Sequence, residues 1–180
     1  MRYILSLLIL ILISGGLYAA LSNANKASFK QKRITCQQTT TTFERIYSQT
    51  KLKEAITQLE ANNYTIDIQI DYSKYMNSNL INILNEKQAI DKLQIVLKPF
   101  IKEQKQTEDK LLIDFYIYEN DKEDKRKKGD KCKLYAGYVM LEFKYKGISI
   151  YKIQTDYMQD NISDMNERLT CAIKSFISLK

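Results

Sequence analysis

Apolar and polar residues alternate strictly over residues 64–72, which is the clearest structural signal in the chain. A period of two residues indicates a β-strand with one face buried. The apolar side of this strand holds Tyr64, Ile66, Ile68, Ile70 and Tyr72, and the polar side holds Thr65, Asp67, Gln69 and Asp71. The sequence therefore predicts a half-buried strand with an acidic outer face.

Three further strands are predicted at residues 110–119, 134–145 and 148–157. The last two are joined at Lys146-Gly147, a short turn in which glycine can adopt a positive φ. Because these three strands follow one another with no helix between them, the pattern favours an antiparallel meander.

Helical periodicity predicts one helix over residues 41–61 and another over residues 161–179. The first begins at Thr41 and has Glu44 three residues later, which is a capping-box pattern. The second carries a single apolar stripe at helical spacing. Its members are Ile162, Met165, Leu169, Ala172, Ile173 and Phe176.

A third helical segment covers residues 78–104 and contains Pro99, the only proline in the chain. The apolar spacing continues across this proline, so we expect a kink there, or two short helices, rather than a loop. Residues 32–37 are a candidate for a short leading strand.

Together these elements have the order α-β-α-β-β-β-α and predict an α+β fold. We expect an antiparallel meander of about four strands with the helices packed on one face. No linker rich in Gly, Pro or Ser divides the chain. Residues 25–180 are therefore expected to form a single domain.

The first residues resemble a secretory signal peptide. Met1-Arg2 is followed by an apolar run from Tyr3 to Ile13 and then by small and polar residues. Residues 1–19 are the expected signal, with cleavage after Ala24 as a second possibility and an uncleaved anchor as the alternative. The abundance of Lys, Ile and Asn is typical of an AT-rich bacterial genome. The predicted location is therefore the periplasm or the outside of the cell.

Three cysteines lie beyond the predicted cleavage site: Cys36, Cys132 and Cys171. In an oxidising compartment, two of them are expected to form a disulfide. Cys171 lies opposite the apolar stripe of the last helix, where a buried free thiol is not expected, so we infer that it meets another sulfur. Cys132 is the leading candidate partner and Cys36 the alternative, and an exposed free thiol remains the third possibility.

The chain contains no histidine. This excludes Ser-His-Asp and Cys-His catalysis, and it excludes zinc sites with histidine ligands. The scattered cysteines also lack the paired spacing of a zinc site. We therefore expect a protein that is not an enzyme and has no metal or other cofactor.

The formal net charge is +7 and falls to +6 when Arg2 is removed with the signal peptide. Moderate basicity favours loose association with anionic surfaces. The chain has no recognisable nucleic-acid-binding motif, so no nucleic-acid partner is expected.

Paired carboxylates are the remaining catalytic candidates. Asp67 and Asp71 share one strand face roughly 13 Å apart, which exceeds the roughly 5–9.5 Å between glycosidase carboxylates. Asp114 comes closer if its strand pairs with theirs. We favour structural or solvating roles for these carboxylates and keep a carboxylate-dependent hydrolase as the least favoured hypothesis.

Two features are candidates for partner binding. The chain has thirteen tyrosines, and Tyr116 and Tyr118 lie on a predicted strand face, where an apolar ring with a polar tip suits an interface. The loop between the strands at 110–119 and 134–145 contains the basic run Lys125, Arg126, Lys127 and Lys128. Basic residues at an anionic surface contribute about 1 kcal/mol each. Ordinary strand packing and a solvated hairpin tip are the competing interpretations.

These observations lead to one main hypothesis. The chain is expected to be a non-catalytic periplasmic interaction module, an accessory part of a bacterial cell-envelope assembly. Its partner is expected to be an envelope protein or the membrane surface, and its oligomeric state is left open. The alternative is a periplasmic carrier for a small amphipathic ligand or lipid, with the helix around Pro99 covering a curved sheet.

Overall fold

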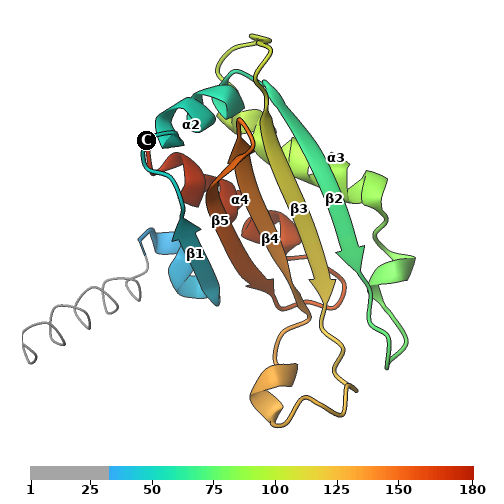
Figure 1. The fold of residues 1–180 in the computed structure, drawn as a ribbon. Helices are drawn as coiled ribbons and strands as arrows, with labels where there is room; N and C mark the ends of the chain where they lie inside the picture. Colours follow the sequence, from blue (N-terminus) through green and yellow to red (C-terminus); the bar gives the residue numbers. More distant parts are fainter. Residues whose placement is uncertain (1–32) are drawn as a thin grey trace, which may run out of the picture. The chain divides into compact units, whose positions relative to one another are not determined.

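The computed structural model describes residues 33–180, in which three α-helices lie against one face of a five-stranded sheet (Figure 1). The strands are β1 (Thr42–Ile46), β2 (Tyr64–Asp71), β3 (Leu111–Glu119), β4 (Gly137–Tyr145) and β5 (Ile148–Tyr157). The α-helices are α2 (Leu52–Glu60), α3 (Glu86–Leu97) and α4 (Met165–Ile177). Short 3₁₀ turns are η1 (Thr35–Thr39), η2 (Leu80–Asn82), η3 (Lys98–Phe100) and η4 (Asp130–Lys133). The predicted signal peptide lies outside the described residues.

The α+β class is confirmed, with one open sheet of strand order β1-β5-β4-β3-β2. The predicted meander is found in β3, β4 and β5, which pair antiparallel. Two features differ from the prediction: the sheet has a fifth strand, β1, and β2 pairs with β3 in parallel. The parallel pair follows from the helix between these strands, because a crossover through a helix returns the chain in the same direction.

The predicted helix over residues 41–61 is wrong in its first half, which forms β1 instead. Four consecutive threonines end at Thr42, and β-branched side chains fit a strand better than a helix. Phe43, which the predicted helix would have turned toward the core, is 63% exposed, because β1 turns it to the sheet's outer face. The helix is confined to α2. The candidate leading strand at 32–37 is also wrong, since its described part enters η1.

The segment predicted as a broken helix over 78–104 divides into η2, α3 and η3. Asn85 caps α3 by a reciprocal capping box: its side chain accepts from the Gln88 N–H at 2.9 Å, and the Gln88 side chain accepts from the Asn85 N–H. Pro99 lies in η3, so the predicted interruption is confirmed. The apolar stripe predicted for the last helix is buried throughout, although α4 begins at Met165 and leaves Ile162 in the turn before it.

The core lies between the helices and the inward-facing residues of the strands. On β3 and β4, alternate residues are fully buried, and they form one cluster with the apolar sides of α2, α3 and α4. Phe176 of α4 stacks on Phe143 of β4 with ring centroids 3.9 Å apart. This arrangement leaves the opposite face of the sheet without a helix in the part of the chain that the structure describes (Figure 1).

A disulfide joins Cys36 to Cys171, so the leading prediction of a Cys132–Cys171 bond is wrong and the alternative partner is the one found. Gln37, next to Cys36, donates to the Ser175 hydroxyl at 3.0 Å, one turn beyond Cys171, which ties η1 to α4. Cys132 lies instead in η4, in the loop between β3 and β4. The inference that Cys171 meets another sulfur is confirmed.

Among the described residues, no helix is long and apolar enough to cross a membrane.

Gly137 is predicted to be intolerant of a side chain. A Cβ at this position would lie 2.1 Å from the Tyr118 carbonyl oxygen and 2.3 Å from the Tyr157 hydroxyl. We expect Gly137→Ala to lower the free energy of unfolding by about 1–3 kcal/mol, the usual cost of overpacking. Urea titration measures this loss. Tyr157→Phe in the same chain removes only the hydroxyl and leaves the ring carbon Cζ 2.4 Å from the added Cβ, so it should not restore stability, and an unchanged stability of Gly137→Ala would contradict the account.

Candidate functional site: the open face of the sheet and a cleft beside it

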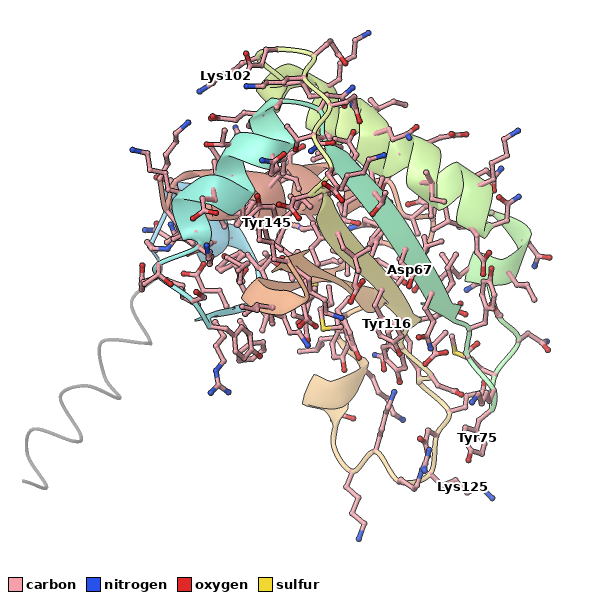
Figure 2. All side chains as sticks on the ribbon, turned by 45° about the horizontal axis from the view of Figure 1, so that its top comes forward. Asp67, Tyr75, Lys102, Tyr116, Lys125 and Tyr145 are labelled. Atoms are coloured by element: carbon pink, nitrogen blue, oxygen red, sulfur yellow. A yellow bond between two sulfur atoms is a disulfide. The ribbon has the colours of Figure 1, made fainter. Side chains whose placement is uncertain are left out.

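The open face is the side of the sheet that faces away from the helices. It is built by alternate residues of all five strands. These residues are Phe43 and Arg45 on β1, Thr65, Asp67, Gln69 and Asp71 on β2, Leu112, Asp114, Tyr116 and Tyr118 on β3, Tyr138, Met140, Glu142 and Lys144 on β4, and Lys152, Gln154 and Asp156 on β5. Figure 2 shows Asp67 and Tyr116 on this face.

One row across the open face changes from basic to acidic. The strand register places Arg45 beside Lys152, then Glu142, Asp114 and finally Asp67 at the far edge. Lys152 pairs with Glu142 at 2.6 Å. Burial alone would raise the pKa of Glu142, but hydrogen bonds from Lys152 and Ser149 outweigh burial and hold the pKa below its ordinary value. The open face therefore has an electrostatic direction, basic at β1 and acidic at β2.

The next row is uncharged and amphipathic. It runs from Phe43 through Gln154, Met140 and Tyr116 to Gln69. A hollow of about 440 Å³ lies over Met140 and Tyr116 and extends to the acidic residues of the neighbouring row. Its floor combines an adaptable thioether, an aromatic ring and polar tips, which is the composition of protein interfaces.

Three tyrosines form a cluster at one end of the open face. Tyr138 stacks on Tyr118 with ring centroids 4.9 Å apart and lies 5.9 Å from the ring of Tyr116. The Tyr116 hydroxyl donates to Asp71, and burial together with this hydrogen bond raises the pKa of Tyr116. The structure therefore brings Tyr116 and Tyr118 of β3 together with Tyr138, a third tyrosine from the next strand.

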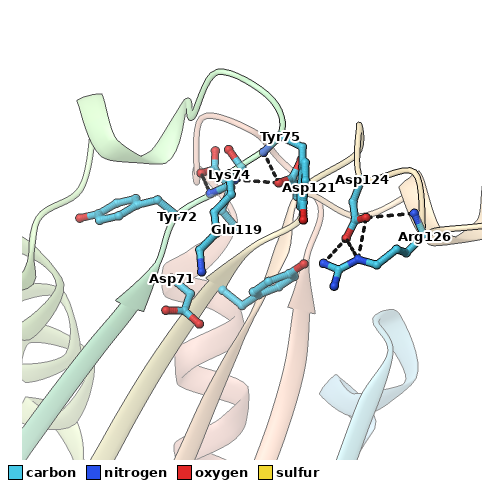
Figure 3. A pocket seen from close by; sticks show the side chains of 10 residues that line it. Asp71, Tyr72, Lys74, Tyr75, Glu119, Asp121, Asp124 and Arg126 are labelled. Carbon is cyan, nitrogen blue, oxygen red and sulfur yellow. Dashed lines mark hydrogen bonds and ion pairs between the residues drawn. The ribbon is translucent and has the colours of Figure 1, made fainter.

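Beyond the tyrosines, two loops enclose a cleft of about 130 Å³, which we call the loop cleft (Figure 3). One loop follows β2 and the other follows β3. The two loops lie together because the carboxyl ends of these parallel strands lie side by side. The lining residues are Asp71, Tyr72, Ser73, Lys74, Tyr75, Tyr118, Glu119, Asp121, Asp124 and Arg126. Figure 2 shows Tyr75 and Lys125 at this end of the molecule.

Two buried carboxylates hold the loops together. Glu119 accepts hydrogen bonds from the backbone of Ser73, Asn79 and Leu80 and from the Ser78 hydroxyl, at 2.5–3.0 Å. Asp121 accepts from the backbone N–H groups of Lys74 and Tyr75. Burial would raise the pKa of Glu119, but its four hydrogen bonds prevail and hold the pKa below its ordinary value. Sequence reasoning missed both carboxylates: Glu119 ends a strand and Asp121 lies in the acid-rich loop after it, and nothing in the local pattern marks either one.

The basic run of the β3–β4 loop is not one exposed patch. Arg126 pairs with Asp124 at 2.8 Å and stacks over the Tyr75 ring, 5.6 Å from its centroid. The hydrogen bonds from Arg126 lower the pKa of Asp124 to about 2. Lys125 and Lys128 are exposed. Within the described chain, these two residues are the part of the predicted basic site that projects into solvent.

Lys127 points inward and organises the loop. Its ammonium group donates to the Tyr118 hydroxyl at 3.0 Å, to the Asp121 carbonyl at 2.9 Å and to the Asn120 side chain. It also lies 5.4 Å from the centre of the Tyr118 ring. Lys127 therefore links the loop to the tyrosine cluster.

Replacing Lys127 by methionine should loosen this loop, because three acceptors lose a charged donor. We expect hydrogen exchange in residues 120–136 to quicken by about tenfold, the equivalent of roughly 1.4 kcal/mol of local stability. Lys125→Met is the matched control, since Lys125 is exposed, and it should leave exchange unchanged. Equal effects of the two substitutions would show that Lys127 has no special structural role.

The predicted catalytic candidates lie on the open face, where the strand register places Asp67 beside Asp114. Lys144 forms an ion pair with Asp114, and Tyr116 donates to Asp71. No group of three or more metal-ligating side chains is found in the part of the chain that the structure describes.

Comparisons with known proteins give little further information. No family model matches the chain, and no curated protein matches it in sequence. A solved structure that is similar to it is a dodecamer of a PelC variant from Paraburkholderia phytofirmans. The match has 10% sequence identity and a TM-score of 0.33, and it covers 78% of this chain and 96% of that chain. A likeness this slight carries no argument about function.

Proposed function

We propose that this protein is a non-catalytic interaction module of a bacterial cell envelope, which binds a protein partner through the open face of its sheet. The observation that carries this proposal is the composition of that face. It joins an amphipathic row centred on Met140 and Tyr116 to a row that changes from basic to acidic. Such a face fits a partner in one orientation, because a reversed partner would bring like charges together.

The disulfide supports an oxidising location for this function, since such bonds persist in the periplasm and outside the cell. We propose the periplasm, in keeping with the signal-like first residues. The exposed Lys125 and Lys128 at the tip of the β3–β4 loop extend the binding surface beyond the sheet. Their charge suits an acidic rim on the partner, or the membrane surface beside it.

The two competing functions receive less support. A carrier for an amphipathic ligand needs a cavity beneath the helices, but the residues there form one continuous cluster of buried side chains. A carboxylate-dependent hydrolase needs reactive carboxylates, but Asp114 and Asp71 are occupied by Lys144 and Tyr116. We therefore favour binding over transport or catalysis.

Affinity capture from envelope extracts tests this function. The wild-type protein is expected to recover one envelope protein, and Met140→Glu, at the centre of the open face, should reduce that recovery by at least about tenfold. Ile95→Glu is the matched control, since Ile95 is an exposed apolar residue on α3 and receives the same change. Recovery of no partner by the wild type, or equal loss in both variants, would contradict the proposal.

A further inference from the structure

The two edges of the sheet are protected to different degrees. Edge strands expose unpaired backbone N–H and C=O groups, and proteins usually block them with short length, charged side chains (lysine above all), inward-pointing charges, proline, bulges or a covering segment. The β1 edge shows several of these devices. It has five residues, carries Arg45, and turns Glu44 inward to accept hydrogen bonds from Tyr151 and Gln37.

The β2 edge has fewer of these devices, and its only charged side chains are Asp67 and Asp71 on the open face. This strand has eight residues and contains no proline, lysine or arginine. It follows its neighbour without a register shift and ends the strand order, so no described strand lies beyond it (Figure 1). Three isoleucines and a tyrosine give it high β-propensity. A long and regular edge of this kind is a template for pairing with another chain, and its two aspartates restrict which chain can pair with it.

The side chains of β2 are also incompletely covered. On the helix side, Ile66, Ile68 and Ile70 pack against the core but stay half-buried, whereas the matching residues of β3 are fully buried. One more strand beyond β2 would complete their burial. On the open face, the strand presents Asp67 and Asp71 and no basic residue.

We propose that β2 binds an extended segment of a partner protein, which adds to the sheet as a sixth strand. The segment has apolar residues on the helix side, to cover the isoleucines, and lysine or arginine on the open side, to face the two aspartates. Main-chain hydrogen bonds supply affinity in such pairing, and alternate side chains supply specificity. The added strand would pair with the backbone of β2 at the acidic border of the open face, and it would share Asp67 and Asp71 with that face.

Charge decides against a second copy of the same strand as the occupant. Pairing β2 with another β2, isoleucine side to isoleucine side, would set the aspartates of the two copies opposite or diagonal to one another. Like charges in these positions destabilise a strand pair, whereas opposite charges stabilise it. The acidic strand therefore favours a basic partner over itself.

A nine-residue peptide of alternating valine and lysine, blocked at both ends, tests this site by calorimetric titration against the whole protein. We expect binding, and we expect the peptide with glutamate in place of lysine to bind at least about tenfold more weakly. Two N-methylated versions of the lysine peptide are also tested, one methylated at every odd position and one at every even position, which we call the two frames. Only one frame points its N–H groups at the edge, so binding should be lost in that frame alone.

Substitutions in the protein complete the test. Asp67→Lys leaves Asp71 in place and should weaken the preference for the lysine peptide, while Asp91→Lys, the same change at an exposed position of α3, should preserve it. Equal binding of the two peptides, or N-methylation effects that do not depend on frame, would overturn the proposal. A protein dimer that dissociates when the peptide is added would assign the edge to a second copy and also overturn it.

Discussion

Replacing Cys36 by serine is expected to lower the free energy of unfolding by about 2–4 kcal/mol. The bond joins residues 135 positions apart, so it closes a long loop and removes much conformational freedom from the unfolded chain. Domains of this size are stable by only about 5–15 kcal/mol in total. The loss should therefore be plain in a urea titration of the oxidised proteins.

Cys132→Ser is the control for that experiment, because Cys132 is not in the disulfide that the structure contains. It should leave stability unchanged, and a non-reducing peptide digest should still join the segments holding Cys36 and Cys171. A digest that instead joins Cys132 to Cys171 would contradict the pairing. The same digest of Cys36→Ser should contain no bond to Cys171.

Replacing Glu119 by alanine is the second change with a large expected effect. It would leave four donors without their acceptor, one of them buried and three half-buried, at about 1–3 kcal/mol for each buried donor and less where water can reach. We expect a total loss of roughly 3–5 kcal/mol, with hydrogen exchange quickened in residues 73–80. Glu119→Gln keeps one oxygen and should lose about half as much, while Glu123→Ala, at an exposed position, should lose nothing.

The Glu119 carboxylate also predicts a pH dependence. Its pKa is lower in the folded than in the unfolded protein, so its stabilising contribution is fully present above the ordinary glutamate range. The contribution is lost as pH falls below that range and through the lowered pKa. Wild type should therefore lose more stability than Glu119→Gln between neutral pH and pH about 3. Parallel losses in the two proteins would contradict this assignment.

Local periodicity was sufficient to predict the elements that form the core. The strands at 64–72, 110–119 and 148–157 lie close to β2, β3 and β5, and the apolar stripe of α4 is buried as expected. These segments combine strict alternation or helical spacing with burial on one side, so pattern and environment agree. The predicted break at Pro99 also follows from local chemistry.

The missed features depend on contacts between distant parts of the chain. β1 has a capping-box pattern at its start, but it becomes a strand because β5 offers it an edge for pairing. With β1 assigned to a helix, Phe43 and Arg45 could not be placed on the sheet, and the charge gradient of the open face could not be predicted.

The same limit applies to the candidate site. Tyr116 and Tyr118 share a predicted strand face, so their exposure on one side of the sheet could be expected. The loop cleft could not, because it depends on Glu119 and Asp121 binding the backbone of a loop about forty residues earlier. The basic run also changes character in three dimensions, since Lys127 turns inward and Arg126 pairs with Asp124.

The central claim is that the open face binds a protein partner, and photo-crosslinking in intact bacterial cells tests it most directly. A photoreactive amino acid replaces Met140 on the open face in one tagged copy, and Ile95 on α3 in another. The account predicts a discrete adduct with one envelope protein from position 140 and none from position 95. No adduct from position 140, or the same adducts from both positions, would contradict it.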